Sequence, residues 1–493
     1  MPQLTWWHPR LPTLVLLGFA AGLPILLIFS SLSLWLAEAG VARASVTMFS
    51  WAALGYSFKF VWAPLVDRLV LPGLGRMGRR RSWLAFAQLN VVAAILAMSA
   101  VDPSHAGALP LMALAAVWLG FASATQDIAI DAYRIECAPV QWQAMLSAAY
   151  IAGYRVGMVV AGAGALWLAD AWGSARGAYA AHAWQQAYQV MAGCMLLGLL
   201  TTWLMPEPVV SQDAVPQPNE SPRHGPLLLL FAGVVAVFVS AFALLAPWVA
   251  MAQGPALSLA AEMLRLAVSV GLGLATGQLL VRWGWVPATL LRQTWLAPVQ
   301  SFFAEHGART AWLLLALIGL YRISDIVLGV ISNVFYLDMG YSKTDIAQAV
   351  KTFGVVVSIA GGFLGGLLAT RWGVMRCLFW GAVVSAVTNL LFVWLALSGA
   401  EVAGLYAVVT ADNLAAGFAS AAFVAFLSSL TQVSFTAVQY AVFSSLMTLL
   451  PKTLGGYSGG MVDAMGYPWF FAFTAGLGVP VLVLVVWAGK RLK

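Results

Sequence analysis

The chain has 493 residues, of which 62% are hydrophobic and only 9% charged, and its formal net charge is +7. Soluble globular domains carry about 25% charged residues, so this composition excludes an ordinary soluble protein and is typical of a polytopic membrane protein. The basic residues lie mostly in loops between apolar runs. That placement favours contact with an anionic membrane surface and argues against nucleic acid as a partner.

Fourteen apolar runs are long enough to cross a bilayer as helices, since about 20 residues span its hydrocarbon core. In chain order the runs lie at 13–37, 46–66, 82–101, 109–131, 143–168, 186–205, 226–250, 256–281, 311–337, 345–369, 374–398, 402–430, 432–450 and 468–489. The pattern predicts an all-α polytopic membrane protein with two six-helix lobes and two inserted helices. Such paired lobes around a midplane site are typical of secondary transporters.

Composition divides the chain into four predicted parts. Residues 1–205 form a first lobe and residues 311–493 a second. Residues 206–225 are rich in Pro, Ser, Asn and charge, so they cannot bury a core and are predicted to be a cytoplasmic linker. Residues 226–310 hold the two inserted helices and a tryptophan-containing stretch that fits a membrane interface.

The distribution of basic residues predicts the orientation. An even number of spans places both termini on one side of the membrane. Sixteen of the 25 Lys and Arg residues fall on that side, four on the other, and five within spans. By the positive-inside rule both termini are predicted to be cytoplasmic. The first apolar run is too long for the core of a cleavable signal peptide.

No cofactor or metal is expected. The three cysteines show neither a pairing pattern nor metal spacing, and all five histidines lie outside the apolar runs. A primary pump is disfavoured because the chain lacks a Gly-x-x-x-x-Gly-Lys-Ser/Thr loop. A channel and a membrane-embedded acyl- or glycosyltransferase remain as rivals from other classes. Acyl transfer usually relies on a His base, whereas a glycosyltransferase would need only carboxylates.

The stretch 124–136 is the strongest candidate site in the chain. Asp127 and Asp131 are four residues apart and share one helix face, and Arg134 follows on the same stripe. Each such charge at membrane depth costs roughly 2.5–3.5 kcal/mol, so it usually faces a cavity or a partner. The two carboxylates are our prediction for proton coupling. The alternative is a structural salt-bridge cluster that joins two helices.

Two further cations lie within predicted spans. Arg155 stands between Gly153 and Gly157, which allow a neighbouring helix to approach closely. Arg155 either pairs with one of the two aspartates or binds a cargo carboxylate, for which its bidentate geometry is suited. Lys351 presents the same choice between a cargo carboxylate and a pair with Asp412.

Other charged residues fit structural roles better. Arg322 and Asp325 are three residues apart and can pair on one helix, as can Glu262 and Arg265. Lys59 lies near the cytoplasmic end of its span, where a lysine can snorkel to the surface.

Several polar or aromatic side chains in the spans are candidates to hydrogen-bond or stack on a cargo. For any single one of them, packing is an equally good explanation in a chain that is 12% aromatic. The candidates are Gln126, Tyr150, Tyr154, Gln439 and Tyr440.

The loop after the second span is short, basic and interrupted by glycines, and a weaker echo of it lies at 365–376. The charged residues of this loop are predicted to form a gating network together with Arg134, Arg322 and Asp325. The alternative is that the basic residues of both loops only anchor the protein by the positive-inside rule. The loop residues concerned are Asp67, Arg68, Arg79 and Arg80. Just before the echo, Gly361-Gly-Phe-Leu-Gly365-Gly predicts a tight helix–helix contact.

Asp67-Arg68 followed by Gly and Arg-Arg-Arg resembles the signature loop of the major facilitator superfamily. Longer strings resemble one branch of it, the AmpG-type muropeptide permeases. They are Gly18-Phe-Ala-Ala-Gly-Leu-Pro24, Phe58-Lys-Phe-Val-Trp-Ala-Pro-Leu-Val-Asp-Arg68, Ser123-Ala-Thr-Gln-Asp-Ile-Ala-Ile-Asp-Ala132, Gly153-Tyr-Arg-Val-Gly-Met158, Lys351-Thr-Phe-Gly354 and Asp412-Asn-Leu-Ala-Ala-Gly-Phe-Ala-Ser-Ala-Ala-Phe-Val-Ala425. The resemblance covers about 10–205 and 311–490.

The resemblance implies a proton-driven permease of the bacterial inner membrane. The expected partners are the small-molecule cargo, protons and membrane lipid, and because the two-lobe architecture works as a single chain, a monomer is expected. Its cargo would be N-acetylglucosaminyl-anhydro-N-acetylmuramic acid, with or without peptide, imported for cell-wall recycling. In some bacteria this import feeds β-lactamase induction and so antibiotic resistance. The family also implies two helices inserted between the lobes. Asp412-Asn413 departs from the Glu-Asn expected in the family. Relatives in the wider family carry siderophores or acyl-CoA, which remain as alternative cargo.

Overall fold

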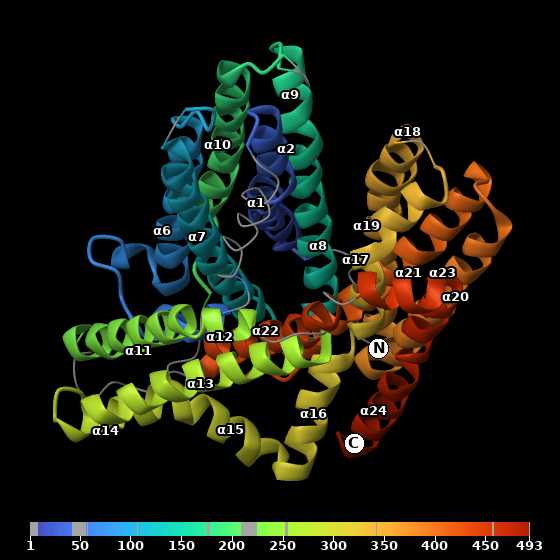
Figure 1. Cartoon of the computed structure of the whole chain (residues 1–493). Helices are drawn as coiled ribbons and strands as arrows, with labels where there is room; N and C mark the ends of the chain where they lie inside the picture. Colours follow the sequence, from blue (N-terminus) through green and yellow to red (C-terminus); the bar gives the residue numbers. More distant parts are fainter. Residues whose placement is uncertain are drawn as a thin grey trace.

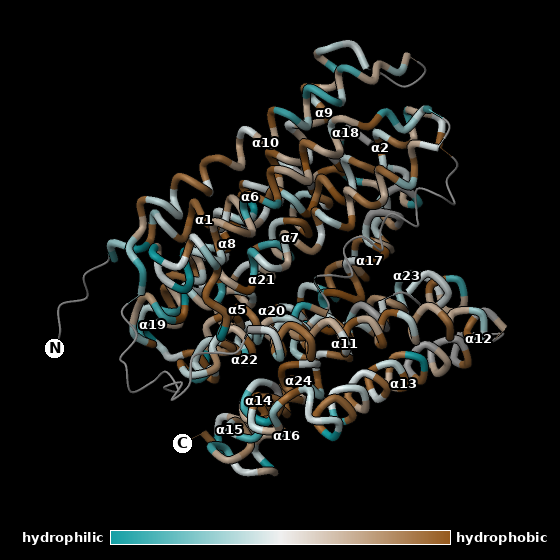
Figure 2. Tube along the Cα trace, turned by 90° about the vertical axis from the view of Figure 1, so that its left-hand side faces the viewer, coloured by the Kyte–Doolittle hydropathy of each residue, from teal (hydrophilic) through white to brown (hydrophobic). Residues whose placement is uncertain are grey.

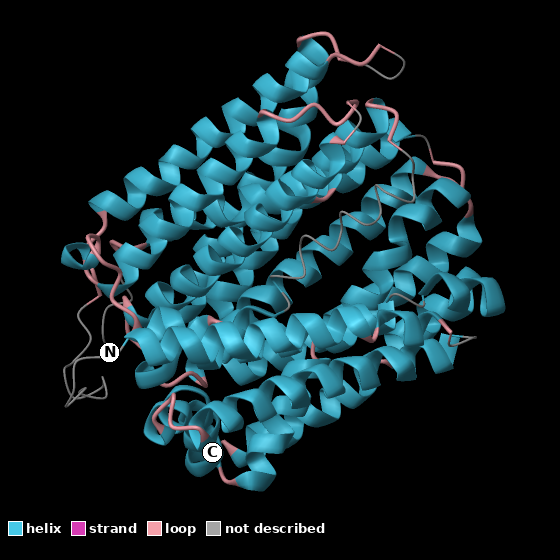
Figure 3. Ribbon diagram, turned by 60° about the vertical axis from the view of Figure 1, so that its left-hand side comes forward, coloured by secondary structure: helices cyan, strands magenta, loops and turns pink. Residues whose placement is uncertain are grey.

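The computed structural model describes residues 8–41, 56, 58–105, 107–174, 178–208, 224–251, 255–341, 343–455 and 458–492. Within these ranges, thirteen helices are long and apolar enough to cross a membrane. They coincide with thirteen of the fourteen predicted runs, and the other run, 46–66, lies mostly outside the described residues. Helices make up nearly all of the described chain, as Figure 3 shows, so the predicted all-α membrane fold is confirmed. Most of the linker 206–225 also lies outside these ranges.

The first lobe is built from long helices joined by short turns. Pro24 lies within the first of them, which breaks at Phe29, and a π-helical turn at Val160–Gly164 continues α8 into α9. The elements are α1 (Leu11–Ile28), α2 (Ser30–Glu38), η2 (Lys59–Val61), α5 (Ala63–Arg68), α6 (Arg79–Ser99), α7 (Ala108–Glu136), α8 (Gln143–Val159), α9 (Ala165–Ala171) and α10 (Ala181–Leu204). Along α10 hydrophobic residues dominate (Figure 2), and those exposed there, such as Leu196 and Trp203, suit a lipid-facing surface.

Glycines allow α1 and α8 to pack backbone to backbone. A Cβ at Gly18 or Gly22 would collide with the carbonyl oxygen of Tyr150 or Tyr154, and one at Gly153 with that of Val15. Such close approach is what small residues provide between membrane helices. It also fixes the position of Tyr150, Tyr154 and their neighbour Arg155 on α8.

We expect Gly153→Ala to destabilise the protein by about 1–3 kcal/mol, because the added methyl group overpacks a contact that has no room for it. Gly193→Ala is the matched control, since a Cβ on that α10 glycine meets no atom within 4 Å. Thermal unfolding of the two purified variants in one detergent gives the comparison. Equal midpoints for both variants would contradict the tight α1–α8 contact.

The second lobe repeats the plan with more breaks. Its α19 and α21 approach closely through Gly361, Gly365 and Gly417, where a Cβ would strike the facing backbone, so the predicted tight contact at 361–366 is confirmed. Gly466 has φ 76° and interrupts α23 two residues before Pro468. The elements are α16 (Ala308–Leu320), α17 (Ile323–Asp338), α18 (Lys343–Ile346), η8 (Ala347–Phe353), α19 (Gly354–Trp372), α20 (Val374–Ser398), α21 (Val402–Ser429), η9 (Val433–Phe435), α22 (Thr436–Gly455), α23 (Ser458–Gly476) and α24 (Gly478–Arg491).

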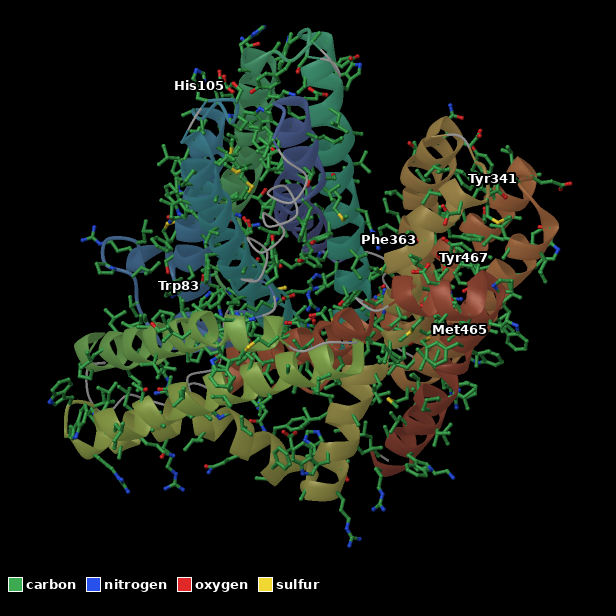
Figure 4. The ribbon with its side chains drawn as sticks, in the orientation of Figure 1. Trp83, His105, Tyr341, Phe363, Met465 and Tyr467 are labelled. Atoms are coloured by element: carbon green, nitrogen blue, oxygen red, sulfur yellow. The ribbon has the colours of Figure 1, made fainter. Side chains whose placement is uncertain are left out.

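The two lobes meet at one end and diverge toward the other (Figure 1). At the meeting end α19 contacts α8, where Gly366 lies against Ala144 and Ala148. We call this the Asp67 end, and the opposite one the His105 end. Figure 4 shows His105 near the upper tip of the first lobe, Tyr341 toward the corresponding end of the second lobe, and Trp83 low in the first lobe. The structure therefore holds the lobes closed at the Asp67 end.

The segment between the lobes forms a helical hairpin. Its α11 (His224–Leu244) and α13 (Pro255–Arg282) lie side by side, connected by α12 (Ala246–Ala250), and in Figure 1 both run across the direction of α6 and α7. Arg265 is buried, stacks 3.7 Å from the Phe242 ring and donates to the Phe242 carbonyl, so it joins the two helices. The side chain of Glu262, its predicted partner, lies outside the described residues. Then follow α14 (Ala288–Leu291), η7 (Arg292–Leu296) and α15 (Ala297–His306).

Candidate transport site and inter-lobe latch

Asp131 lies between two cations. Its carboxylate is 3.5 Å from Lys59 Nζ and 3.3 Å from the Arg134 guanidinium, and all three side chains are buried. Lys59 is only 6% exposed, so the expectation that it snorkels to the surface is wrong. Burying these charges is tolerable because they are paired. Asp131 therefore has the ion pairs expected of a structural salt-bridge cluster.

Asp127, one helical turn earlier on α7, has a different environment. It is buried, and its Oδ1 has no hydrogen-bond partner among the described residues. It lies within electrostatic range of both Lys59 and Asp131. A buried carboxylate without a partner is costly when ionised, and binding a proton removes that cost. The structure thus separates two aspartates that share one face into a paired and an unpaired carboxylate.

Tyrosines surround the two aspartates. The rings of Tyr150 and Tyr154 lie 6.1 Å apart on α8, and both lie within electrostatic range of Asp127 and Asp131. Tyr440, from α22 of the second lobe, stacks 5.1 Å from the Arg134 guanidinium. These three predicted site residues are therefore brought together around the carboxylates.

Gln126 and Gln439 lie elsewhere. Gln126 is buried against α1, where its amide donates to the Ala20 carbonyl at 2.9 Å. The Gln439 amide donates to the Pro298 carbonyl and to Ser301, and accepts from the Gln432 backbone. Both ends of the Gln439 amide are occupied in holding elements together, so the geometry favours packing over cargo binding there. At Gln126 only the NH2 group is bonded, and the buried Oε1 has no partner among the described residues.

Arg134 connects the lobes at the Asp67 end. Its guanidinium donates to Ser147 of α8 at 2.9 Å and to Ser428 of α21 at 2.7 Å, in addition to its bond to Asp131. Since Ser428 and Tyr440 belong to the second lobe, one buried side chain joins the aspartate cluster to the inter-lobe contact. Separating the lobes at this end must break the bond to Ser428.

Asp67 forms a second link between the lobes. Its carboxylate accepts from the backbone N–H groups of Ala437 (3.3 Å) and Val438 (3.1 Å), at the N-terminus of α22. Free N–H groups and the helix dipole favour a negative charge there. Arg80, which is 2.8 Å from Asp67 and also bonded to Glu136, holds the carboxylate in place. We call these bonds of Asp67 and Arg134 to the second lobe the latch.

Two carboxylates of this network were missed in the sequence. Glu136 pairs with both Arg79 and Arg80. Glu207 accepts from the backbone N–H groups of Arg80 and Arg81 and so caps α6. The sequence did carry a signal for both: each is an acidic residue at the end of a predicted span, on the same side of the membrane as the basic loop.

A second charged group lies in the second lobe. Arg322 is 3.1 Å from Asp325 and donates to Ser420 of α21 at 2.7 Å, so the predicted pair forms. Asp412 lies within electrostatic range of both members, and it has no ion pair within the described ranges. The side chain of Lys351, the predicted partner of Asp412, is outside those ranges.

Arg155 stands between the two groups. It lies within electrostatic range of Tyr154 in its own lobe and of Arg322 in the other. It forms no ion pair or hydrogen bond with any other residue that the structure describes. A half-buried guanidinium without a carboxylate has its donors available for an anionic group.

The described part of the chain contains no group of three His, Cys, Asp or Glu side chains placed to hold a metal ion.

A curated relative decides the family. The putative transporter AmpG 4 of Rickettsia felis is 30% identical over 484 residues, which cover 98% of this chain and 97% of the relative. The chain belongs to the AmpG family of transporters. The anhydromuropeptide permease of Escherichia coli K12 is 29% identical over 99% of this chain and 81% of its own length.

Two solved structures support the fold, and a family model matches part of the chain. The E. coli fucose:proton symporter FucP aligns with a TM-score of 0.62 at 12% identity, covering 97% of this chain and 98% of its own. The proton:xylose symporter XylE aligns with a TM-score of 0.61 at 13% identity, covering 96% and 94%. A family described as acetyl-coenzyme A transporter 1 matches residues 11–172. This AmpG-family chain is thus a polytopic membrane transporter with the major facilitator fold.

Proposed function

We propose that this protein imports muropeptides, N-acetylglucosaminyl-anhydro-N-acetylmuramic acid with or without peptide, together with protons. It works in the bacterial inner membrane with both termini in the cytoplasm, so the Asp67 end faces inward. The name of the E. coli relative supports the cargo, and the excess of basic residues on the terminus side supports the orientation.

The unpaired carboxylate of Asp127 is the observation that carries the proton coupling. Asp131 already has two cations, whereas Asp127 has no hydrogen-bond donor at its Oδ1 among the described residues. Asp127 loads a proton while the His105 end is open and releases it when the lobes rearrange around Lys59. At about 150 mV, one charge carries about 3.5 kcal/mol, which is enough for a few-hundred-fold accumulation.

The cargo lies between Arg155 and the group of Arg322, Asp325 and Asp412. Muropeptides carry at least one carboxylate, and a guanidinium binds a carboxylate through two parallel hydrogen bonds. Tyr150 and Tyr154 line the path from this cation to Asp127 and offer rings on which a sugar can stack. Arg155 and Arg322 come from different lobes, so the binding of cargo to both depends on the distance between the lobes.

We expect Arg155→Ala to raise the half-saturating muropeptide concentration about tenfold to a hundredfold, the range for losing hydrogen bonds to a charged group. Arg155→Lys keeps the charge but loses the bidentate geometry, so it should fall between wild type and Ala. Initial uptake rates over a range of cargo concentrations give the values. Arg309→Ala, an exposed arginine at the start of α16, serves as control. Unchanged half-saturation in Arg155→Ala would remove Arg155 from the cargo site.

We propose that this conformation is one stage of alternating access. With the latch closed at the Asp67 end and the lobes diverging toward the His105 end, the cytoplasmic side is shut. Import requires the latch to open once cargo and proton are bound, since the cargo must leave between the same helices.

Uptake of labelled anhydromuropeptide into proteoliposomes, with and without an inward proton gradient, tests the proposal. We expect accumulation that a protonophore abolishes. Gradient-independent equilibration would remove the proton coupling. Absence of muropeptide uptake alongside gradient-driven uptake of a siderophore or an acyl-CoA would replace the cargo, and the partial match to acetyl-coenzyme A transporters makes acyl-CoA the first of these to test. Chemically altered muropeptide in detergent, without a membrane, would point to an enzyme.

A further inference from the structure

The segment 288–306, made of α14, η7 and α15, runs from the inserted hairpin to the second lobe. We call it the strap. Figure 1 shows α15 leading from α14 to the foot of α16. In the oriented protein the strap lies on the cytoplasmic side, next to the latch.

The C-terminal half of the strap is fastened to the second lobe. The Phe302 ring is buried 5.3 Å from Phe443 of α22. The Gln439 amide, also from α22, donates to the Pro298 carbonyl at 2.9 Å and to Ser301 at 3.2 Å. Glu305 accepts a hydrogen bond from the Gln432 side chain. With buried rings and several hydrogen bonds, α15 must move with the second lobe.

The N-terminal half of the strap packs on the inserted hairpin, and the turn that follows it is hydrogen-bonded to the first lobe. The Arg68 guanidinium, at the end of α5, donates to the backbone carbonyl of Gln293 at 2.5 Å and contacts its side-chain oxygen at 3.5 Å. Leu290 packs on the hairpin residues Leu230 and Leu280. It also contacts a core cluster that contains first-lobe residues together with Ala437 and Ala441 of α22.

The inserted hairpin is itself docked on the first lobe. Phe238 of α11 lies 5.4 Å from Phe58, and Leu227 is buried within that core cluster. The hairpin and the first half of the strap therefore belong mechanically to the first lobe.

Between the two halves lies an irregular turn. Residues 292–296 form a π-helix, a rare conformation that often occurs at functional sites. Arg68 binds the strap at this turn. Its neighbour in sequence, Asp67, binds the N-terminus of α22, so the end of α5 holds the second lobe directly and the strap beside it.

We infer that the strap is a clasp for the cytoplasm-closed state. Arg68 holds it closed at Gln293, and this bond opens each time the cytoplasmic side opens, while the π-helical turn absorbs the movement. The inserted hairpin then has a function, because it anchors the strap on the first lobe. The contacts of the strap thereby connect the two lobes in addition to the covalent path that passes through the linker at 206–225. This inference rests on the alternating access proposed above, but on neither the cargo nor the proton.

Distances between spin labels on the two lobes test the clasp without a transport assay. Cys137, Cys194 and Cys377 are first replaced by Ser, and Gln141→Cys in the first lobe and Leu492→Cys in the second carry the labels, since both positions are exposed. The ratio of the long, cytoplasm-open distance to the short one is measured in the labelled parent and in variants.

Arg68→Ala removes the bond between the strap's turn and the first lobe, and Glu305→Ala removes one of the bonds between the strap's C-terminal end and the second lobe. We expect each to raise this ratio about fivefold, as for loss of one hydrogen bond. The double variant should resemble either single one, because both changes open the same clasp. Arg76→Ala removes an exposed charge from the same loop as Arg68 and should leave the ratio unchanged.

Each outcome decides a different question. If Arg68→Ala and Glu305→Ala leave the ratio at the parent value, or if their effects add independently, the strap is not a clasp. If the parent itself shows a single distance under all conditions, including added muropeptide, alternating access fails and the clasp with it. Failure of muropeptide uptake alone would leave the distance result standing.

Discussion

Asp127→Asn should abolish uphill transport while leaving exchange intact. The amide has the shape of the protonated acid but cannot release a proton, so the transporter can still close around cargo and reopen. Accumulation driven by a proton gradient should fall from a few hundredfold to about onefold. Counterflow, in which internal unlabelled cargo exchanges for external labelled cargo, should stay within about threefold of wild type, because the substitution leaves packing nearly unchanged.

The comparison that isolates this effect is between the two carboxylates of the stripe. Asp131→Asn removes the partner of Lys59 and Arg134 and leaves two buried cations less well paired, so it should impair exchange as well as accumulation. Asp170→Asn, at an exposed position on α9, should change neither. Gradient-driven accumulation by Asp127→Asn at the wild-type level would exclude Asp127 as the proton carrier.

Arg134→Ala should reduce both transport and exchange about a hundredfold. The arginine bonds to Asp131, Ser147 and Ser428 and stacks on Tyr440, and breaking one side of a buried pair costs about 3–5 kcal/mol. Because Ser428 and Tyr440 belong to the second lobe, the latch should weaken as well, which shifts the protein toward a state that is open at the Asp67 end.

Measurement of uptake and counterflow, together with the label distances described for the strap, separates these contributions. Arg81→Ala is the matched control, since Arg81 bonds to the carbonyls of Thr202 and Trp203 within the first lobe. It should leave the label distances unchanged. A purely local role for Arg134 would instead show as lost transport at unchanged distances.

The apolar runs alone determined the membrane fold. A segment in lipid must form all its backbone hydrogen bonds internally, as a helix does, so each span can be recognised from its length and composition. Thirteen predicted spans match described helices, and the small-residue contact at 361–366 forms as expected. The ion pair of Arg322 and Asp325 could also be predicted from the sequence, because the two residues are three apart on one helix. In each case the information is local in the chain.

Tertiary structure decided which of the charged residues are paired. The sequence placed Asp127 and Asp131 on one face, but only the approach of Lys59 from another helix distinguishes them. The latch between Asp67 and the N-terminus of α22 joins residues 370 positions apart through backbone groups that carry no sequence signal.

The strap shows the same limit. Gln439 has the chemistry of a sugar-binding residue, yet the fold directs its amide to α15, and Arg68 meets Gln293 across the inserted hairpin. Ion pairs and hydrogen bonds between lobes depend on the relative placement of rigid helices. Composition and periodicity fix the helices themselves, but that placement arises only when they pack together.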